Sequence, residues 1–183
     1  MKNAMILIPL LAGLTSALPA AAFELHSADI HANAKLDEKQ VFKGFGCEGG
    51  NVSPQLSWSN APNGTKSFAL MVYDPDAPTG SGWWHWVVWN IPATATALPT
   101  GAGTADGAQL PAGSVQGRTD FGSTGYGGAC PPKGDKPHRY IFTLYALKVD
   151  RLDVPENATS ALVGFNVRAN SLGATSITAK YSR

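Results

Sequence analysis

The sequence has few cysteines, few charged residues and no long uninterrupted apolar run. Only 2 of its 183 residues are cysteine and only 15% are charged, with a formal net charge of +1. A chain so close to neutrality gives no electrostatic reason to bind nucleic acid or an anionic membrane. The two cysteines lack neighbouring ligands at CxxC spacing, which argues against a zinc site. These shortages exclude strongly basic binding proteins and disfavour cysteine-based metal modules.

The first 22 residues have the form of a separate unit. Lys2 is the only charged residue before Glu24, a short apolar run covers 6–14, and three alanines occupy 20–22. This order is typical of a secretory signal peptide. A membrane anchor is the alternative, but a span needs about 20 mostly apolar residues. We expect residues 1–22 to be cleaved, so that no transmembrane segment remains and 23–183 forms one periplasmic or secreted domain.

Export would place this domain in an oxidising compartment. Cys47 and Cys130 then fit one disulfide bond. Such a bond would close a long loop and stabilise the fold by ~2–4 kcal/mol. Two buried free thiols are the alternative.

The mature chain combines many turn-forming residues with short apolar stretches. Its 20 glycines and 13 prolines favour short strands over long helices. A helical pattern begins after Asn157, a possible N-cap, and continues to Gly173. We expect a mostly β protein with two packed antiparallel sheets, one C-terminal helix and a long surface connection over 92–115. Strand patterns occupy 23–27, 53–58, 68–74, 84–91, 138–148 and 177–181.

The stretch from Asp74 to Asn90, DPDAPTGSGWWHWVVWN, carries unusual chemistry between two apolar strands. Prolines and glycines interrupt it, which predicts a loop. The loop and its ends hold Asp74, Asp76 and His85. Charged groups at strand ends are poor core material unless they are paired. The stretch is therefore a candidate site.

A second histidine has the same sequence context. His138 follows a Gly/Pro-rich loop and begins an apolar strand, as His85 does. If the two strands share a sheet, both imidazoles open at one rim, and Tyr140 lies on the same strand face as His138. The structural alternative is that His85 is a core histidine bonded to Asp74 or Asp76, and that His138 caps a turn.

This set of residues can hold an anion. A protonated imidazole donates from both ring nitrogens, and Tyr140 donates an O–H. Backbone N–H groups around Gly127 and Gly128 could point inward, a common way to cradle phosphate. Asp74 would accept from one imidazole and orient it. We expect affinity for a phosphate-like ligand to fall as pH rises through the pKa of the histidine.

Several segments spread over nearly all of the mature chain carry a family resemblance. They are NVSPQLSW (51–58), YDPDAP (73–78), WHW (84–86), NIP (90–92), TDFG (119–122) and the stretch 128–140 with PPKG and HRY. They resemble the phosphatidylethanolamine-binding protein (PEBP) family, in its bacterial YbhB/YbcL branch, often labelled Raf kinase inhibitor-like. The leader and the cysteine pair look most like the exported, YbcL-type members.

The resemblance implies a PEBP-like fold, a two-sheet antiparallel β-sandwich with a C-terminal α-helix and short peripheral helices. It also implies a small rim cavity that binds phosphate, acetate or phospholipid head groups. We expect no cofactor, no metal and no catalytic residue. The ligand-binding residues that it implies are Asp74, Asp76, Trp84, His85, Gly128, Pro132, His138 and Tyr140.

Three functions follow, and we favour the first. The first is an exported, non-catalytic protein that binds small anions or phosphorylated or phospholipid head groups. The second is a regulator that acts through a protein partner, with the tryptophans of 83–89 as a contact surface and the cavity as a sensor. The third is a hydrolase or metal-dependent enzyme, because His85, His138 and Asp74 match a two-histidine, one-carboxylate set in type. No GxSxG or HExxH sequence supports the third.

Overall fold

The computed structural model describes residues 21–183. Nearly all of the expected signal peptide lies outside the described residues, so its cleavage stays a prediction. Within the described part of the chain, the search for a helix that is both long and apolar enough to cross a bilayer finds none.

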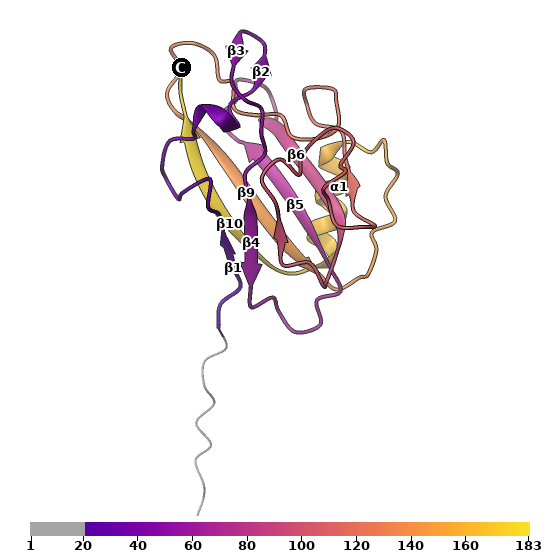
Figure 1. The fold of residues 1–183 in the computed structure, drawn as a ribbon. Coiled ribbons are helices and arrows are strands. Elements are labelled where there is room, and N and C mark those ends of the chain that lie inside the picture. Colours follow the sequence, from indigo (N-terminus) through magenta and orange to yellow (C-terminus); the bar gives the residue numbers. More distant parts are fainter. Residues whose placement is uncertain (1–20) are drawn as a thin grey trace, which may run out of the picture.

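A five-stranded antiparallel sheet with the order β10-β9-β5-β6-β8 runs through the molecule (Figure 1). Its strands are β5 (Ser67–Asp74), β6 (Trp83–Pro92), β8 (Val115–Gln116), β9 (His138–Leu147) and β10 (Ser171–Tyr181). A smaller sheet has the order β1-β4-β7, and β2 pairs with β3 in a hairpin. These strands are β1 (Glu24–His26), β4 (Leu56–Ser59), β7 (Ala97–Leu98), β2 (Lys43–Gly44) and β3 (Cys47–Glu48).

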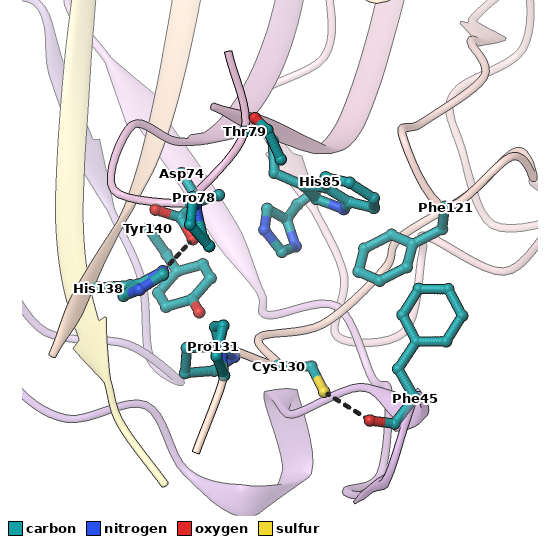
Figure 2. Close-up of a pocket in the computed structure, with 13 residues that line it drawn as sticks. Phe45, Asp74, Pro78, Thr79, His85, Phe121, Cys130, Pro131, His138 and Tyr140 are labelled. Carbon is teal, nitrogen blue, oxygen red and sulfur yellow. Dashed lines mark hydrogen bonds and ion pairs between the residues drawn. The ribbon is translucent and has the colours of Figure 1, made fainter. Parts of the chain in front are cut away.

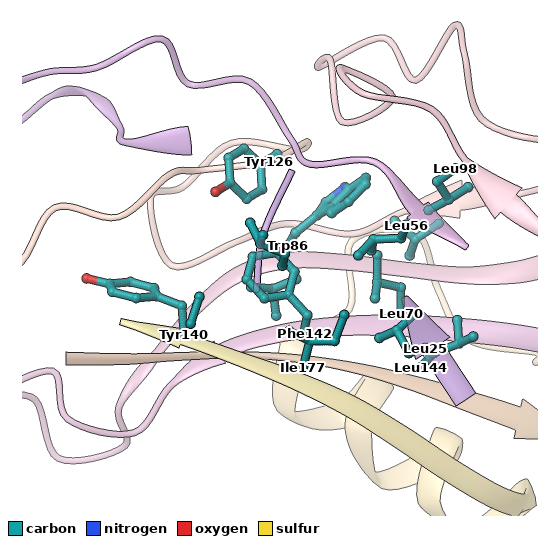
Figure 3. Close-up of a cluster of buried hydrophobic side chains, with 14 of the residues drawn as sticks. Leu25, Leu56, Leu70, Trp86, Leu98, Tyr126, Tyr140, Phe142, Leu144 and Ile177 are labelled. Carbon is teal, nitrogen blue, oxygen red and sulfur yellow. The ribbon is translucent and has the colours of Figure 1, made fainter. Parts of the chain in front are cut away.

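The main core lies between the two larger sheets (Figure 3). Leu56 and Leu98 of the small sheet belong to the same buried cluster as Leu70 and Trp86 of the large one. All four are fully buried, and burial of such side chains stabilises a fold by ~1.5–3 kcal/mol each. The alternating apolar pattern of the strands therefore produces the two-sheet arrangement that the sequence predicts.

The opposite face of the large sheet packs against the helix α1 (Ser160–Asn170). Met71 and Trp89 from the sheet share a buried cluster with Val163 and Val167 from the helix. The central strands β5 and β6 are thus covered on both sides, which explains their nearly continuous apolar sequences.

The structure corrects the boundaries of the predicted helix. Thr159, not Asn157, is the N-cap, and its side chain accepts from the backbone N–H of Leu162. The helix ends at Asn170, and β10 begins at the next residue, six positions earlier than the expected start at Ile177. Pairing with β9 overrides the weaker local preference for helix, because tertiary context outweighs intrinsic propensity.

Two peripheral segments complete the fold. A short 3₁₀ helix, η1, covers Glu38–Gln40. The expected surface connection over 92–115 is mostly irregular, but β7 within it pairs with β4, and Leu98 is fully buried there. Part of this connection therefore belongs to the core and not to the surface.

Candidate functional site

A cavity of about 200 Å³ opens at the rim of the large sheet, where β5 ends and β6 and β9 begin (Figure 2). Four side chains, which we call the polar floor, bring titratable groups into it. The polar floor consists of Asp74, His85, His138 and Tyr140. The strands are antiparallel neighbours, so the end of β5 meets the start of β9. The structure thus brings Asp74 and His85 together with His138 and Tyr140, which lie more than 50 positions further along the sequence.

Asp74 and His138 form a buried pair. His138 Nδ1 donates to Asp74 Oδ2 at 2.7 Å, and each side chain is only 4% exposed. The other carboxylate oxygen of Asp74 accepts the backbone N–H of Asp76 at 2.8 Å. The far nitrogen of His138, Nε2, lies 3.4 Å from Asp135 Oδ2 at the edge of the cavity. The prediction that Asp74 accepts from one imidazole is confirmed.

A β-bulge in β6 turns His85 into the cavity. On β5, Val72 pairs with Trp86. The next residue of β5, Tyr73, pairs with Trp84, so within the described sheet His85 has no partner on β5. An extra residue of this kind shifts the alternation of side chains along a strand and often re-aims one of them at a site.

The same bulge decides which tryptophan lines the cavity. Among the described residues 21–183, Trp83 lines the cavity and Trp84 does not. The Trp84 ring instead lies 4.4 Å from the Tyr73 ring and packs with the cluster on the helix side of the sheet. The expected contribution of Trp84 is therefore corrected, and Trp83 takes its place.

His85 is held as a neutral imidazole. Its Nδ1 lies 2.7 Å from the carbonyl oxygen of Gly127. A carbonyl only accepts, so Nδ1 carries the hydrogen, and in the neutral ring Nε2 is an acceptor. Burial lowers the pKa of His85, although the Gly127 carbonyl and the charge of Asp74 oppose this effect. The alternative in which His85 bonds to Asp74 or Asp76 is not what the structure shows, because its Nδ1 bonds to the backbone.

Two donors in the cavity wall lack partners. Tyr140 Oη and Trp83 Nε1 are buried and make no hydrogen bond within residues 21–183. Burial raises the pKa of Tyr140 above its usual 10, so its hydroxyl stays protonated and remains a donor. A buried donor without an acceptor costs about 1–3 kcal/mol. An acceptor entering the cavity would recover this cost.

The glycines near the site have a structural role. The Gly127 N–H donates to the His85 carbonyl, and the Gly128 N–H donates to Asn51 Oδ1 at 2.8 Å. Both groups are already satisfied, so the expected inward-pointing cradle is not present here. A Cβ on residue 128 would come within 2.3 Å of the Gln40 carbonyl oxygen. Gly128 therefore allows two backbone segments to approach and does not line the cavity.

Asp76 also lies outside the cavity wall. Its carboxylate accepts from Arg139 Nη2 at 2.7 Å and from Arg139 Nε at 2.8 Å, and also from the backbone N–H of Arg139. These contacts tie the loop after β5 to the start of β9. The Arg139 guanidinium holds the pKa of Asp76 at about 2, below its usual 3.8.

We expect Asp76→Asn to lower the melting temperature at pH 7 by about 2–4 °C, because the pair with Arg139 is partly exposed and worth little. A depressed carboxylate pKa contributes stability above its unfolded value and loses it as pH falls through the folded value. The difference between variant and parent should therefore shrink between about pH 4 and pH 2. Thermal unfolding at pH 7 and pH 2 measures it, and an equal difference at both values would contradict the prediction.

The rest of the wall is mostly apolar, and of its apolar members the sequence predicts only Pro132 as a site residue. Phe45, Trp83 and Phe121 each lie beside a glycine, which is the signal that could have marked them. The apolar residues are Phe45, Ala77, Pro78, Trp83, Phe121, Pro131 and Pro132, and Thr79 also lines the wall. Cys130 lines the same wall and is bonded to Cys47, as the sequence predicts.

Two alternatives from the sequence lose support. In the described part of the chain, no three His, Cys, Asp or Glu side chains gather as a metal site requires. The tryptophans of 83–89 do not form one contact surface, because Trp86 and Trp89 are buried on opposite faces of the sheet.

The comparisons with known proteins decide the family. Residues 26–182 match the family model described as phosphatidylethanolamine-binding protein. The chain belongs to the PEBP family. It is 56% identical to YbcL of Escherichia coli over 177 residues, which cover 97% of each chain. It is 55% identical to YbhB of the same organism over 159 residues, or 87% of this chain and 99% of that protein.

Solved PEBP structures agree. The crystal structure of E. coli YbcL, described as a member of the mammalian PEBP family, matches with a TM-score of 0.87 and 58% identity. The match covers 89% of this chain and 99% of that one. A PEBP homologue from Chlamydia trachomatis matches with a TM-score of 0.73 and 31% identity, over 88% and 98% of the two chains. The resemblance to the YbhB/YbcL branch and the PEBP fold are both confirmed.

Proposed function

We propose that this protein is an exported, non-catalytic binding protein whose rim cavity holds small anions, such as phosphate, a carboxylate or a phosphorylated head group. The observation that carries this proposal is the Tyr140 hydroxyl, a buried donor in the cavity without an acceptor within residues 21–183. Trp83 Nε1 is a second donor of the same kind. Oxyanions supply several acceptor lone pairs in a small volume, which suits a cavity lined by residues with unpaired donors.

The charged and titratable groups around the cavity determine which protonation states of phosphate and His85 can bind together. Asp74 is engaged by His138 and by a backbone N–H, so its carboxylate is screened on two sides. His85 presents an acceptor when neutral and a donor when charged. A phosphate oxygen can therefore bind either with its own proton donated to Nε2 or with a proton gained by His85. Both routes give the complex one proton more than HPO4²⁻ and a neutral His85 hold together, so affinity falls as pH rises above the second pKa of free phosphate.

The proposal is tested by titrating the purified protein with inorganic phosphate in a calorimeter. Tyr140→Phe removes only a hydroxyl that has no protein partner, so we expect equal or higher thermal stability and about tenfold or greater loss of phosphate affinity. For the parent protein, the affinity should stay nearly constant while free phosphate is the monoanion, and it should fall by up to about tenfold per pH unit once pH exceeds the second pKa of phosphate.

Tyr126→Phe is the matched control. Tyr126 is also buried, but its hydroxyl donates to the Gln40 carbonyl at 2.9 Å and lies outside the cavity. This change should lower stability by about 1 kcal/mol and leave phosphate affinity unchanged. Equal phosphate affinity in Tyr140→Phe and the parent, or an affinity independent of pH, would contradict the proposed function.

A further inference from the structure

A chain of aromatic rings leads from the polar floor to the outside of the molecule. His85 lies edge-on to Phe121, with ring centroids 5.4 Å apart, and Trp83 lies 5.3 Å from Phe121. Phe121 stands 5.7 Å from Phe45. Figure 2 shows these two phenylalanines on the side of the cavity opposite Asp74 and His138. We call Phe45, Phe121 and Trp83 the aromatic wall.

Phe45 occupies a position that does not suit it. Its side chain is 68% exposed, so it adds little to the core. Phe45 and Gly46 form the two-residue turn between β2 and β3, with φ of 52° and 74°. Such turns favour Asn, Asp or Gly, because a bulky side chain is disfavoured in the left-handed region. A strained and exposed aromatic residue at the mouth of a cavity points to a role in binding.

The hairpin that carries Phe45 is fixed against the cavity from two directions. The Cys47–Cys130 disulfide joins it to the cavity wall. The guanidinium of Arg183 donates to the Gly46 carbonyl and to the Pro131 carbonyl, and so bridges the turn and the wall. The backbone that carries Phe45 is therefore fixed before any ligand arrives, which reduces the entropy lost on binding.

The second ring of the wall is also positioned by the backbone. A Cβ on residue 127 would come within 2.3 Å of the Phe121 ring, so glycine at this place lets the ring lie close to the chain. Phe42 supports the same ring from behind, stacked at a centroid distance of 4.1 Å. Phe121 thus presents a fixed aromatic surface between the floor and Phe45.

The cavity has more room than a bare oxyanion fills. Its volume of about 200 Å³ corresponds to about seven waters at ~30 Å³ each. A substituent on a phosphate held by the polar floor can lie against the aromatic wall, which lines the same cavity. Uncharged aromatic rings attract a flat ring by stacking as well as by burial of apolar area. An alkyl group would gain only the burial.

We propose that the aromatic wall is a second subsite, which makes the cavity selective for anions that carry an aromatic ring, such as aryl phosphates. This inference rests on the proposed function, because the polar floor must hold the anion. Phe45 is the specificity-determining residue, and the floor supplies affinity that does not depend on it.

The test compares phenyl phosphate, methyl phosphate and inorganic phosphate by calorimetric titration of the purified protein. Phenyl phosphate should bind about threefold to tenfold more tightly than methyl phosphate, the range typical of one aromatic contact. Phe45→Asn should remove most of this preference and leave the affinity for inorganic phosphate within about twofold. Because Asn suits the turn, the variant should melt at or above the parent temperature.

Phe165→Asn is the matched control. Phe165 is 71% exposed on α1 and does not line the cavity. It should leave all three affinities unchanged.

Each other outcome is informative. Equal affinities for phenyl and methyl phosphate, with phosphate bound, would overturn the subsite and leave the proposed function standing. Tighter binding of phosphocholine than of phenyl phosphate would also overturn it, by assigning the wall to a cation. A parallel loss of all three ligands in Phe45→Asn would show that Phe45 only shapes the hairpin. Failure to bind phosphate at all would overturn the proposed function and the subsite together.

Discussion

His138→Ala is expected to lower the free energy of unfolding by about 3–5 kcal/mol. The change leaves the Asp74 carboxylate, which is 4% exposed, without its imidazole donor. Desolvation of an unpaired carboxylate is costly, and the remaining backbone N–H of Asp76 does not replace a partner that can carry charge. For a chain of this size the melting temperature should fall by roughly 6–20 °C. Thermal and urea unfolding at pH 7 measure both quantities.

Two further variants isolate the cause. His138→Asn can place an amide N–H near the position of Nδ1, so it should recover much of the lost stability. Asp74→Asn combined with His138→Ala removes the buried charge and should be less destabilised than His138→Ala alone. If the single variant and this double variant lose the same stability, the buried charge is not the cause and packing of the imidazole is.

Replacing both cysteines, Cys47→Ala with Cys130→Ala, is expected to lower the free energy of unfolding by about 2–4 kcal/mol. The bond joins residues 83 positions apart. Its loss enlarges the unfolded ensemble and frees the hairpin of β2 and β3. Urea unfolding of the variant and of the parent, each with and without reductant, measures the effect.

The reductant is the internal control for this prediction. It should destabilise the parent to about the level of the double variant and leave the variant unchanged. The polar floor lies on β5, β6 and β9, so phosphate affinity should change far less than stability does. Two reactive thiols in the denatured, unreduced parent protein would contradict the bond itself.

Much of the fold follows from local patterns. Alternating or continuous apolar runs mark β5, β6 and β9, because a strand buries one or both faces and shows it in its sequence. The convergence of Asp74, His138 and Tyr140 follows as well, since antiparallel neighbours bring the end of one strand beside the start of the other. The helix was predicted, but its ends were not, because pairing with β9 and not helix propensity sets the start of β10.

The site differs from the sequence prediction where groups predicted to bind a ligand form hydrogen bonds within the protein. The Gly127 and Gly128 N–H groups were expected to face a ligand, and both are used by the protein. Asp76 was expected in the cavity, and Arg139 holds it outside. The sequence identifies possible hydrogen-bond donors and acceptors, but it does not show which of them already have partners within the folded protein.

The sequence by itself determined the sheet, the convergence of Asp74, His138 and Tyr140, and the family, because each depends on residue types repeated along single strands or on contiguous motifs. Only the tertiary structure decided which side of β6 each residue faces. A bulge is defined by two strands, since it exists only where the partner has one residue fewer. For that reason His85 and Trp83 face the cavity and Trp84 faces the helix side, a result that no pattern within β6 could reveal.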